Sequence, residues 1–140
     1  ASAFFGGLAG NAGLFSTARD VARVYQMLLN GGEIDGQRYL SKETCQLFTT
    51  ETSKISRRGL GFDKPDADDP KKGNCAPAAP AEVYGHTGFT GTCAWVDPMN
   101  ELVYVFLSNR IYPDVTNHKL NQLHIRERIQ GAIYDAMKKK

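Results

Sequence analysis

The stretch GTCAWVDPMNELVYVFL, residues 91–107, decides the fold. Residues 91–96 are predicted to form a strand. Asp97-Pro98-Met99-Asn100 then has the residue types of a tight turn, with Asp in the first position and Pro in the second. Residues 102–107 are almost wholly apolar, which is typical of a strand that is covered on both faces. The stretch therefore predicts an antiparallel pair of strands. We expect that two or three helices do not supply enough cover for both faces of the second strand.

A first helix is predicted before this pair. Ser16 or Thr17 can cap it, and Asp20 stands in a capping-box-like relation to Thr17. Asn30-Gly31-Gly32 ends it. Its apolar residues share one face, which we expect to pack against a core: Val21, Val24, Tyr25, Leu28 and Leu29.

Further elements follow the same logic. Residues 34–40, with Asp-Gly inside, predict a short hairpin or turn. Ser41 can cap a second helix that runs to about Phe48, and a last helix begins near Leu120. The buried stripe predicted for the last helix consists of Ile125, Ile129, Ala132, Ile133 and Ala136.

Two less regular segments lie between the helices and the strand pair. Residues 58–62, Arg-Gly-Leu-Gly-Phe, are predicted to form a short strand with close-packed glycines. Residues 63–82 are rich in proline, alanine and charge without periodicity, and we expect a flexible loop there. The sum is an α+β fold over residues 1–140, in which antiparallel strands are flanked by helices.

Composition excludes several classes of function. The 17 basic and 15 acidic residues give a net charge of +2, which argues against nucleic acid as a partner. No apolar run reaches the length of a membrane span. Cys45, Cys75 and Cys93 lack the spacing of zinc ligands, and three thiols are preferred over one disulfide with a leftover thiol. His118 and His124 share no helical face, so neither a metal nor a cofactor is predicted.

The segment YGHTGFTGT, residues 84–92, is the one that can carry chemistry. Its glycines match a G-x-x-G-x-x-G string, but a dinucleotide-binding loop must lie between a buried strand and a helix N-terminus. Here a proline- and alanine-rich stretch precedes the string and a strand follows it. The start of a strand that lines a cleft fits better, because glycines let a substrate approach the backbone and a free N–H can donate to an oxyanion.

Several segments carry a resemblance to a known superfamily. His86-Thr87-Gly88 is similar to the third motif of serine β-lactamases, penicillin-binding proteins and related esterases, usually Lys-Thr-Gly and sometimes His-x-Gly. Residues 85–92, 95–98 and 105–110 look like the class C β-lactamase-related branch, as do residues 12–22, which resemble its GL-x-ST-A-x-D entry into a helix. Because these segments occur in the expected order, the resemblance is more specific than a three-residue motif.

The resemblance implies a role for each residue of the motif. In such enzymes a serine in Ser-x-x-Lys forms an acyl-enzyme, and a Tyr-x-Asn or Ser-x-Asn element assists proton transfer. The resemblance implies that His86 and the backbone N–H of Phe89 are catalytic, the N–H being half of the oxyanion hole. It implies that Thr87 and Gly88 bind the substrate. Histidine is near neutral at physiological pH, whereas lysine is a cation suited to a carboxylate, so the expected substrate shifts from penicillins toward esters and D-amino-acid peptides.

Both upstream motifs of such enzymes are absent. No serine is followed by lysine three positions later. No tyrosine or serine is followed by asparagine two positions later. We therefore expect a C-terminal fragment of a serine hydrolase acting on an ester, amide or peptide, inactive by itself and partnered by the missing N-terminal part of the same protein. The alternative is a catalytically inactive accessory or binding module, of a kind that can be fused to a glycoside hydrolase. The resemblance suggests a periplasmic or secreted bacterial protein.

Overall fold

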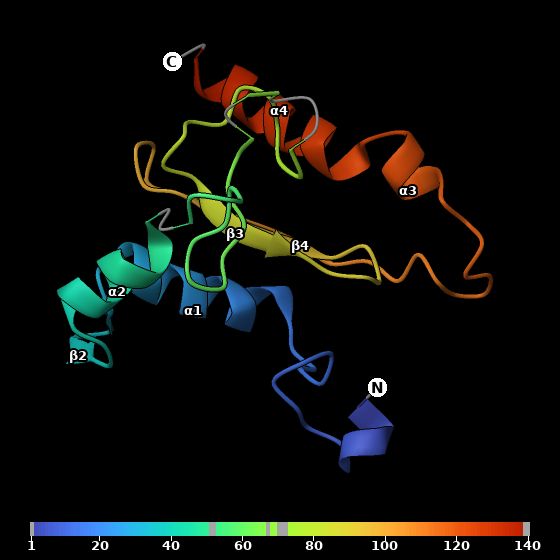
Figure 1. Cartoon of the computed structure of the whole chain (residues 1–140), viewed down its shortest axis with the longest axis horizontal. Coiled ribbons are helices and arrows are strands. Elements are labelled where there is room, and N and C mark those ends of the chain that lie inside the picture. Colours follow the sequence, from blue (N-terminus) through green and yellow to red (C-terminus); the bar gives the residue numbers. More distant parts are fainter. Residues whose placement is uncertain (1, 51–52, 67, 70–72, 139–140) are drawn as a thin grey trace.

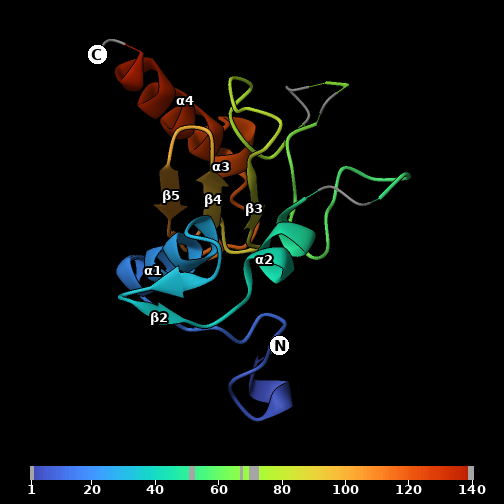
Figure 2. The same cartoon turned by 90° about the vertical axis from the view of Figure 1, so that its left-hand side faces the viewer.

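An antiparallel sheet of three strands lies at the centre of the computed structural model, which describes residues 2–50, 53–66, 68–69 and 73–138. Its strands are β3 (Tyr84–Thr87), β4 (Cys93–Asp97) and β5 (Leu102–Phe106), in the order β3-β4-β5. Helices α1 (Ala18–Leu29) and α2 (Lys42–Thr49) lie on one side of the sheet, and α4 (Ile125–Met137) lies on the other (Figures 1 and 2). The predicted α+β class, with antiparallel strands flanked by helices, is confirmed.

The predicted strand pair is β4 and β5, in register from Cys93 opposite Phe106 to Asp97 opposite Leu102. Asp97 forms the turn between them, because its Oδ1 accepts from the N–H groups of Met99 (2.9 Å) and Asn100 (3.1 Å). The described residues leave β5 only partly covered, in line with the expectation that two or three helices do not supply all the cover it needs. Tyr104 is buried, whereas its four neighbours in β5 are half-buried.

The predicted start and end of α1 are confirmed. Thr17 is the N-cap, and its Oγ1 accepts from the N–H of Asp20 at 3.2 Å. The N–H of Asn30 closes the last turn on the carbonyl of Gln26. The apolar stripe of α1 faces β4 and β5, as predicted, but no residue of the helix is fully buried and Val24 is 55% exposed. A sheet of three strands is too narrow to cover the whole stripe.

The hairpin and the second helix also match their predictions. Strands β1 (Glu33–Ile34) and β2 (Gln37–Arg38) form a two-stranded antiparallel sheet. Ser41 caps α2, accepting from the N–H of Thr44 at 3.1 Å. A 3₁₀ turn, η1 (Ser2–Phe5), opens the chain and lies apart from the sheet (Figure 1).

Two predictions about secondary structure are wrong, and one about burial holds only in part. Residues 58–62 form an isolated bridge position at Gly59 and a bend at Leu60 and Gly61 rather than a strand, because the Gly59 N–H bonds to the carbonyl of Phe62 and folds the segment on itself. The last helix is divided into α3 (Lys119–Gln122) and α4, with His124 between them at a φ of 49°. The fully buried residues of α4 are Arg126, Gln130 and Tyr134. Of the predicted stripe, Ile133 packs against the core and Ile125 is half-buried, whereas Ile129, Ala132 and Ala136 are exposed.

Polar groups on the sheet side of α4 explain which of its faces is buried. The Tyr134 hydroxyl donates to Asp97 Oδ2 at 2.8 Å, and Gln130 Oε1 accepts from the N–H of Ala76 at 2.8 Å. Tyr104 donates its hydroxyl to the carbonyl of Arg126 at 3.1 Å. These partners lie far away in the sequence, so the apolar periodicity of the helix could not predict these hydrogen bonds.

The segment 63–82 forms no helix or strand in its described residues, as predicted. Its described parts are nevertheless anchored, because Asp63, Lys64, Cys75 and Ala76 are all buried. Cys75 joins Val83, Cys93, Trp95 and Tyr104 in the core between the sheet and α4. The predicted flexibility concerned the centre of the loop, where residues 67 and 70–72 lie outside the described residues.

Candidate active site

The predicted site residues follow one another at the carboxyl end of β3. From Gly88 the chain turns and returns as β4, held by the Gly88 N–H on the carbonyl of Thr92 (2.8 Å) and by the Gly91 N–H on the carbonyl of Gly88 (2.9 Å). A side chain at Gly88 would place its Cβ 2.2 Å from Thr92 Oγ1, and Gly91 has a φ of +96°. Glycine is therefore required at both positions by close approach and by backbone conformation.

The outer edge of β3 is closed at one end and open at the other. Asp63 pairs with Gly85 through two backbone hydrogen bonds, of 2.7 and 3.0 Å. Since backbone groups alternate between the two edges of a strand, Thr87 presents its N–H and carbonyl to the same outer edge. Among the described residues nothing accepts from the N–H of Phe89, and this residue is 70% exposed. The open part of the edge therefore begins after Gly85.

The pairing partner of Gly85 is held from several sides. The buried carboxylate of Asp63 forms an ion pair with Arg57 at 2.8 Å and accepts from Asn74 Nδ2 at 2.8 Å. Burial favours the protonated carboxyl, but the hydrogen bonds from Arg57 and Asn74 outweigh it, so the pKa of Asp63 is lowered. An ionised Asp63 thus fixes the segment that closes the edge of β3.

His86 is exposed and has a partner on each ring nitrogen. Nδ1 lies 2.6 Å from the carbonyl oxygen of Thr87, and Nε2 lies 3.2 Å from Nη1 of Arg58. By the alternation of side chains in a strand, His86 and Tyr84 point to the face that carries α1, and Thr87 points to the face that carries α4. The motif therefore offers polar groups to both sides of the open edge.

A cavity of about 550 Å³ lies on the α4 side of the motif, where Thr87, Gly88 and Phe89 form part of its wall. Arg110 and Arg126 line it too, and the Arg110 guanidinium lies 4.8 Å from the centre of the Phe89 ring. Arg126 is only 7% exposed and its Nε has no partner in the described part of the chain. Its Nη2 lies 3.8 Å from Oε1 of Glu127, which lines the same cavity, so Arg110 carries the positive charge of this wall that no lining carboxylate pairs with in the described residues.

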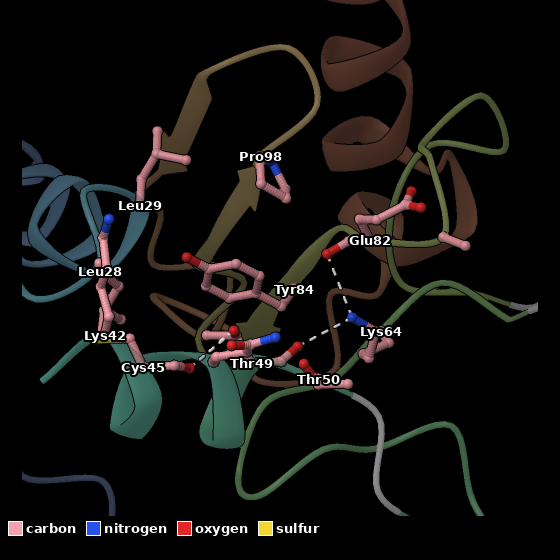
Figure 3. Close-up of a pocket in the computed structure, with 13 residues that line it drawn as sticks. Leu28, Leu29, Lys42, Cys45, Thr49, Thr50, Lys64, Glu82, Tyr84 and Pro98 are labelled. Atoms are coloured by element: carbon pink, nitrogen blue, oxygen red, sulfur yellow. Dashed lines mark hydrogen bonds between the residues drawn. The ribbon is translucent and has the colours of Figure 1, made fainter.

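A second cavity, of about 530 Å³, lies at the other end of β3, between α1, α2 and the loop (Figure 3). Lys64 crosses its wall and donates from Nζ to the carbonyls of Thr49 (3.1 Å) and Glu82 (3.3 Å). Tyr84 lines the same cavity, and burial raises the pKa of its hydroxyl. These contacts tie the loop to α2, and none of the predicted site residues lies here.

Three arginines near the motif were missed by the sequence analysis. Arg58 precedes His86 by 28 residues, and Arg110 and Arg126 follow the motif at some distance. No spacing rule links an arginine in a bend to a histidine in a strand. An exposed arginine beside a glycine-rich turn, as in residues 57–61, was the one available signal, and it is weak.

Comparisons with known proteins show the family of this chain. The family model described as Beta-lactamase matches residues 2–127. The chain belongs to the beta-lactamase family. A putative D-alanyl-D-alanine carboxypeptidase of Escherichia coli O157:H7 is 36% identical over 116 residues, which cover 83% of this chain and 26% of that protein. The protein of the same name from Salmonella agona is 35% identical over 116 residues, with 83% and 27% covered.

A solved structure gives the same result for the fold. A penicillin-binding protein homologue from Caulobacter crescentus matches 64% of this chain and 24% of its own, with 26% identity and a TM-score of 0.50. The predicted relationship to β-lactamases and penicillin-binding proteins is therefore confirmed. The chain spans about a quarter of the length of the relatives that it matches.

Two further observations bear on partners. None of the helices in the described ranges combines the length and the apolar character that crossing a membrane requires. Within those ranges, no three side chains of His, Cys, Asp or Glu gather in a way that could hold a metal ion. The thiols of Cys45, Cys75 and Cys93 are buried and unpaired.

Proposed function

We propose that this chain forms one wall of the active site of a serine hydrolase that cleaves the C-terminal residue from a D-amino-acid peptide. The observation that carries the proposal is the N–H of Phe89, just after β3, for which no described residue supplies an acceptor and whose residue is 70% exposed. The names of the related carboxypeptidases support the peptide as substrate. The nucleophilic serine and its base would come from a part of the protein outside this chain.

The proposed step is acyl transfer. The serine oxygen bonds to the scissile carbonyl carbon and gives its proton to a base, and the carbonyl oxygen takes the negative charge. The Phe89 N–H donates to this oxyanion, and a second N–H comes from the nucleophile's own residue. When the tetrahedral intermediate collapses, the C–N bond breaks and the leaving amine takes a proton. Water then hydrolyses the acyl-enzyme.

The cavity beside Thr87 supports a substrate that ends in a carboxylate. Histidine replaces the usual lysine in the motif, but Arg110 and Arg126 line the cavity on the α4 side of it. A guanidinium is always protonated and binds carboxylates well. Thr87 would donate its hydroxyl to the same carboxylate, and Gly88 would leave room for the backbone of the peptide. His86 would be the polar group on the opposite face of the edge.

The test uses the whole protein and separates the N–H of Phe89 from its side chain. Phe89→Pro removes the N–H, whereas Phe89→Ala keeps it and removes the ring. Loss of one oxyanion-hole donor lowers kcat by about 10²–10³-fold. We expect that loss for Phe89→Pro and a much smaller one for Phe89→Ala, with both variants retaining their circular dichroism. Equal effects of the two substitutions would contradict the role of this N–H.

A covalent serine probe distinguishes this function from that of an inactive accessory module. The whole protein should be labelled at one serine, and His86→Ala should lower turnover without changing the fold. No labelling of the whole protein would favour the accessory module, whereas unchanged turnover in His86→Ala would contradict the role of His86. This chain alone should not be labelled, because neither catalytic motif that precedes the third one is present in it.

A further inference from the structure

The two contacts of the His86 imidazole determine which nitrogen carries its proton. Arg58 Nη1, 3.2 Å from Nε2, belongs to a guanidinium that is protonated at every physiological pH and has no acceptor. Nε2 must therefore be the acceptor in this contact. The Thr87 carbonyl oxygen, 2.6 Å from Nδ1, can only accept, so Nδ1 must carry the hydrogen. Both contacts require the same neutral tautomer, with the proton on Nδ1.

We propose that Arg58 is a positioning residue for His86. Its guanidinium holds the imidazole as the Nδ1–H tautomer and places a permanent positive charge beside the motif, whose usual form has a lysine at the position of His86. The proposal deepens the proposed function, on which its catalytic part rests.

The backbone around Arg58 is held in a way that brings its side chain to this place. Asp63 pairs with Gly85, and the Gly59 N–H bonds to the carbonyl of Phe62 at 3.1 Å, which turns the chain back along β3. A side chain at Gly59 would place its Cβ 2.7 Å from the carbonyl oxygen of Thr50, so this turn lies directly against the end of α2.

Aromatic packing fixes the same segment against β3. The Phe62 ring lies between Tyr84 of β3 and Tyr25 of α1, with ring centres 5.3 and 6.3 Å away. The neighbouring Arg57 is directed to Asp63, at 3.1 Å from its Nη2 to Oδ2, and is not available to His86. Of this adjacent arginine pair, Arg57 holds the edge of β3 and Arg58 holds the imidazole.

The first test reads the tautomer directly and needs no activity. The ring nitrogens of His86 are observed by long-range proton–nitrogen NMR spectra at pH 8 in this chain, in Arg58→Met, in Arg58→Lys and in Arg128→Met. Arg128 lies on α4, on the other side of the sheet, and serves as the control. We expect Nδ1–H in the chain itself, in Arg58→Lys and in the control. In Arg58→Met the Thr87 carbonyl alone no longer fixes the exposed ring, which can turn away from it, so we expect a mixture with Nε2–H. An unchanged tautomer in Arg58→Met would overturn the proposal.

The second test measures turnover of a D-amino-acid peptide by the whole protein. Arg58→Met should lower kcat about tenfold with little change in KM, Arg58→Lys should restore most of it, and Arg128→Met should match the wild type. A loss confined to KM, or no rescue by lysine, would refute a positioning role. If His86→Ala leaves turnover unchanged while the tautomer still depends on Arg58, the catalytic role of His86 fails and the Arg58–His86 pairing stands. If the whole protein shows no turnover and no serine labelling, the proposed function fails, and the tautomer measurement still tests the pairing.

Discussion

Asp63 closes the edge of β3, and its replacement gives the sharpest test of how the site is held. Asp63→Asn keeps the shape of the side chain but turns an amide N–H₂ or a neutral oxygen toward Arg57 and Asn74. The wild-type carboxylate is 1% exposed, and hydrogen bonds to charged groups contribute about 1.5–3 kcal/mol each. The side chain of Arg57 is 31% exposed and regains water, so we expect a net loss of about 2 kcal/mol in the free energy of unfolding.

The same loss should depend on pH in a defined direction. Because the pKa of Asp63 is lowered in the folded chain, the unfolded chain binds more protons at this residue. The stabilisation is therefore complete above the unfolded pKa of about 3.9 and disappears as the pH falls through the lower folded value. The stability difference between the wild type and Asp63→Asn should be largest near neutrality and should shrink in acid.

Urea unfolding at neutral and acid pH measures both effects, with Asp35→Asn as the control. Asp35 also pairs with an arginine, Arg23, but the two side chains are 66% and 52% exposed. An exposed pair contributes at most about 1 kcal/mol. A double-mutant cycle with Arg57→Met should show coupling at Asp63. The reasoning would be refuted if Asp63→Asn cost no more than Asp35→Asn, or if its cost grew in acid.

Two further predictions concern the core under α4. Tyr134→Phe removes the hydroxyl that donates to Asp97 Oδ2 and should lower the free energy of unfolding by about 1.5–3 kcal/mol in urea denaturation. The control is Tyr39→Phe at an exposed tyrosine, which should change the free energy of unfolding by less than about 0.5 kcal/mol in the same assay. Burial raises the pKa of the Cys75 thiol to about 12 and that of the Cys93 thiol to about 11. Both thiols should therefore resist a thiol-specific reagent at pH 8 until urea unfolds the chain. Rapid modification of either thiol in the folded chain would contradict its burial.

Local signals in the sequence predicted much of the fold correctly. The caps at Thr17 and Ser41 and the turn at Asp97 depend on side chains that bond within three residues, so their patterns are visible in the chain itself. The buried face of α4 could not be predicted in this way. Its apolar stripe suggested one face, but Tyr134 and Gln130 find partners 37 and 54 residues away and turn another face to the sheet.

The same distinction between local signals and long-range contacts applies to the candidate site. The sequence by itself determined the motif His86-Thr87-Gly88-Phe89 and its glycine-framed turn, because a tight return between two strands restricts the residues that can form it. Only the tertiary structure decided that Asp63 closes the edge of β3 and that Arg58 meets the imidazole. Those contacts join segments more than twenty residues apart. They depend on where packing against Tyr25 and Tyr84 places Phe62.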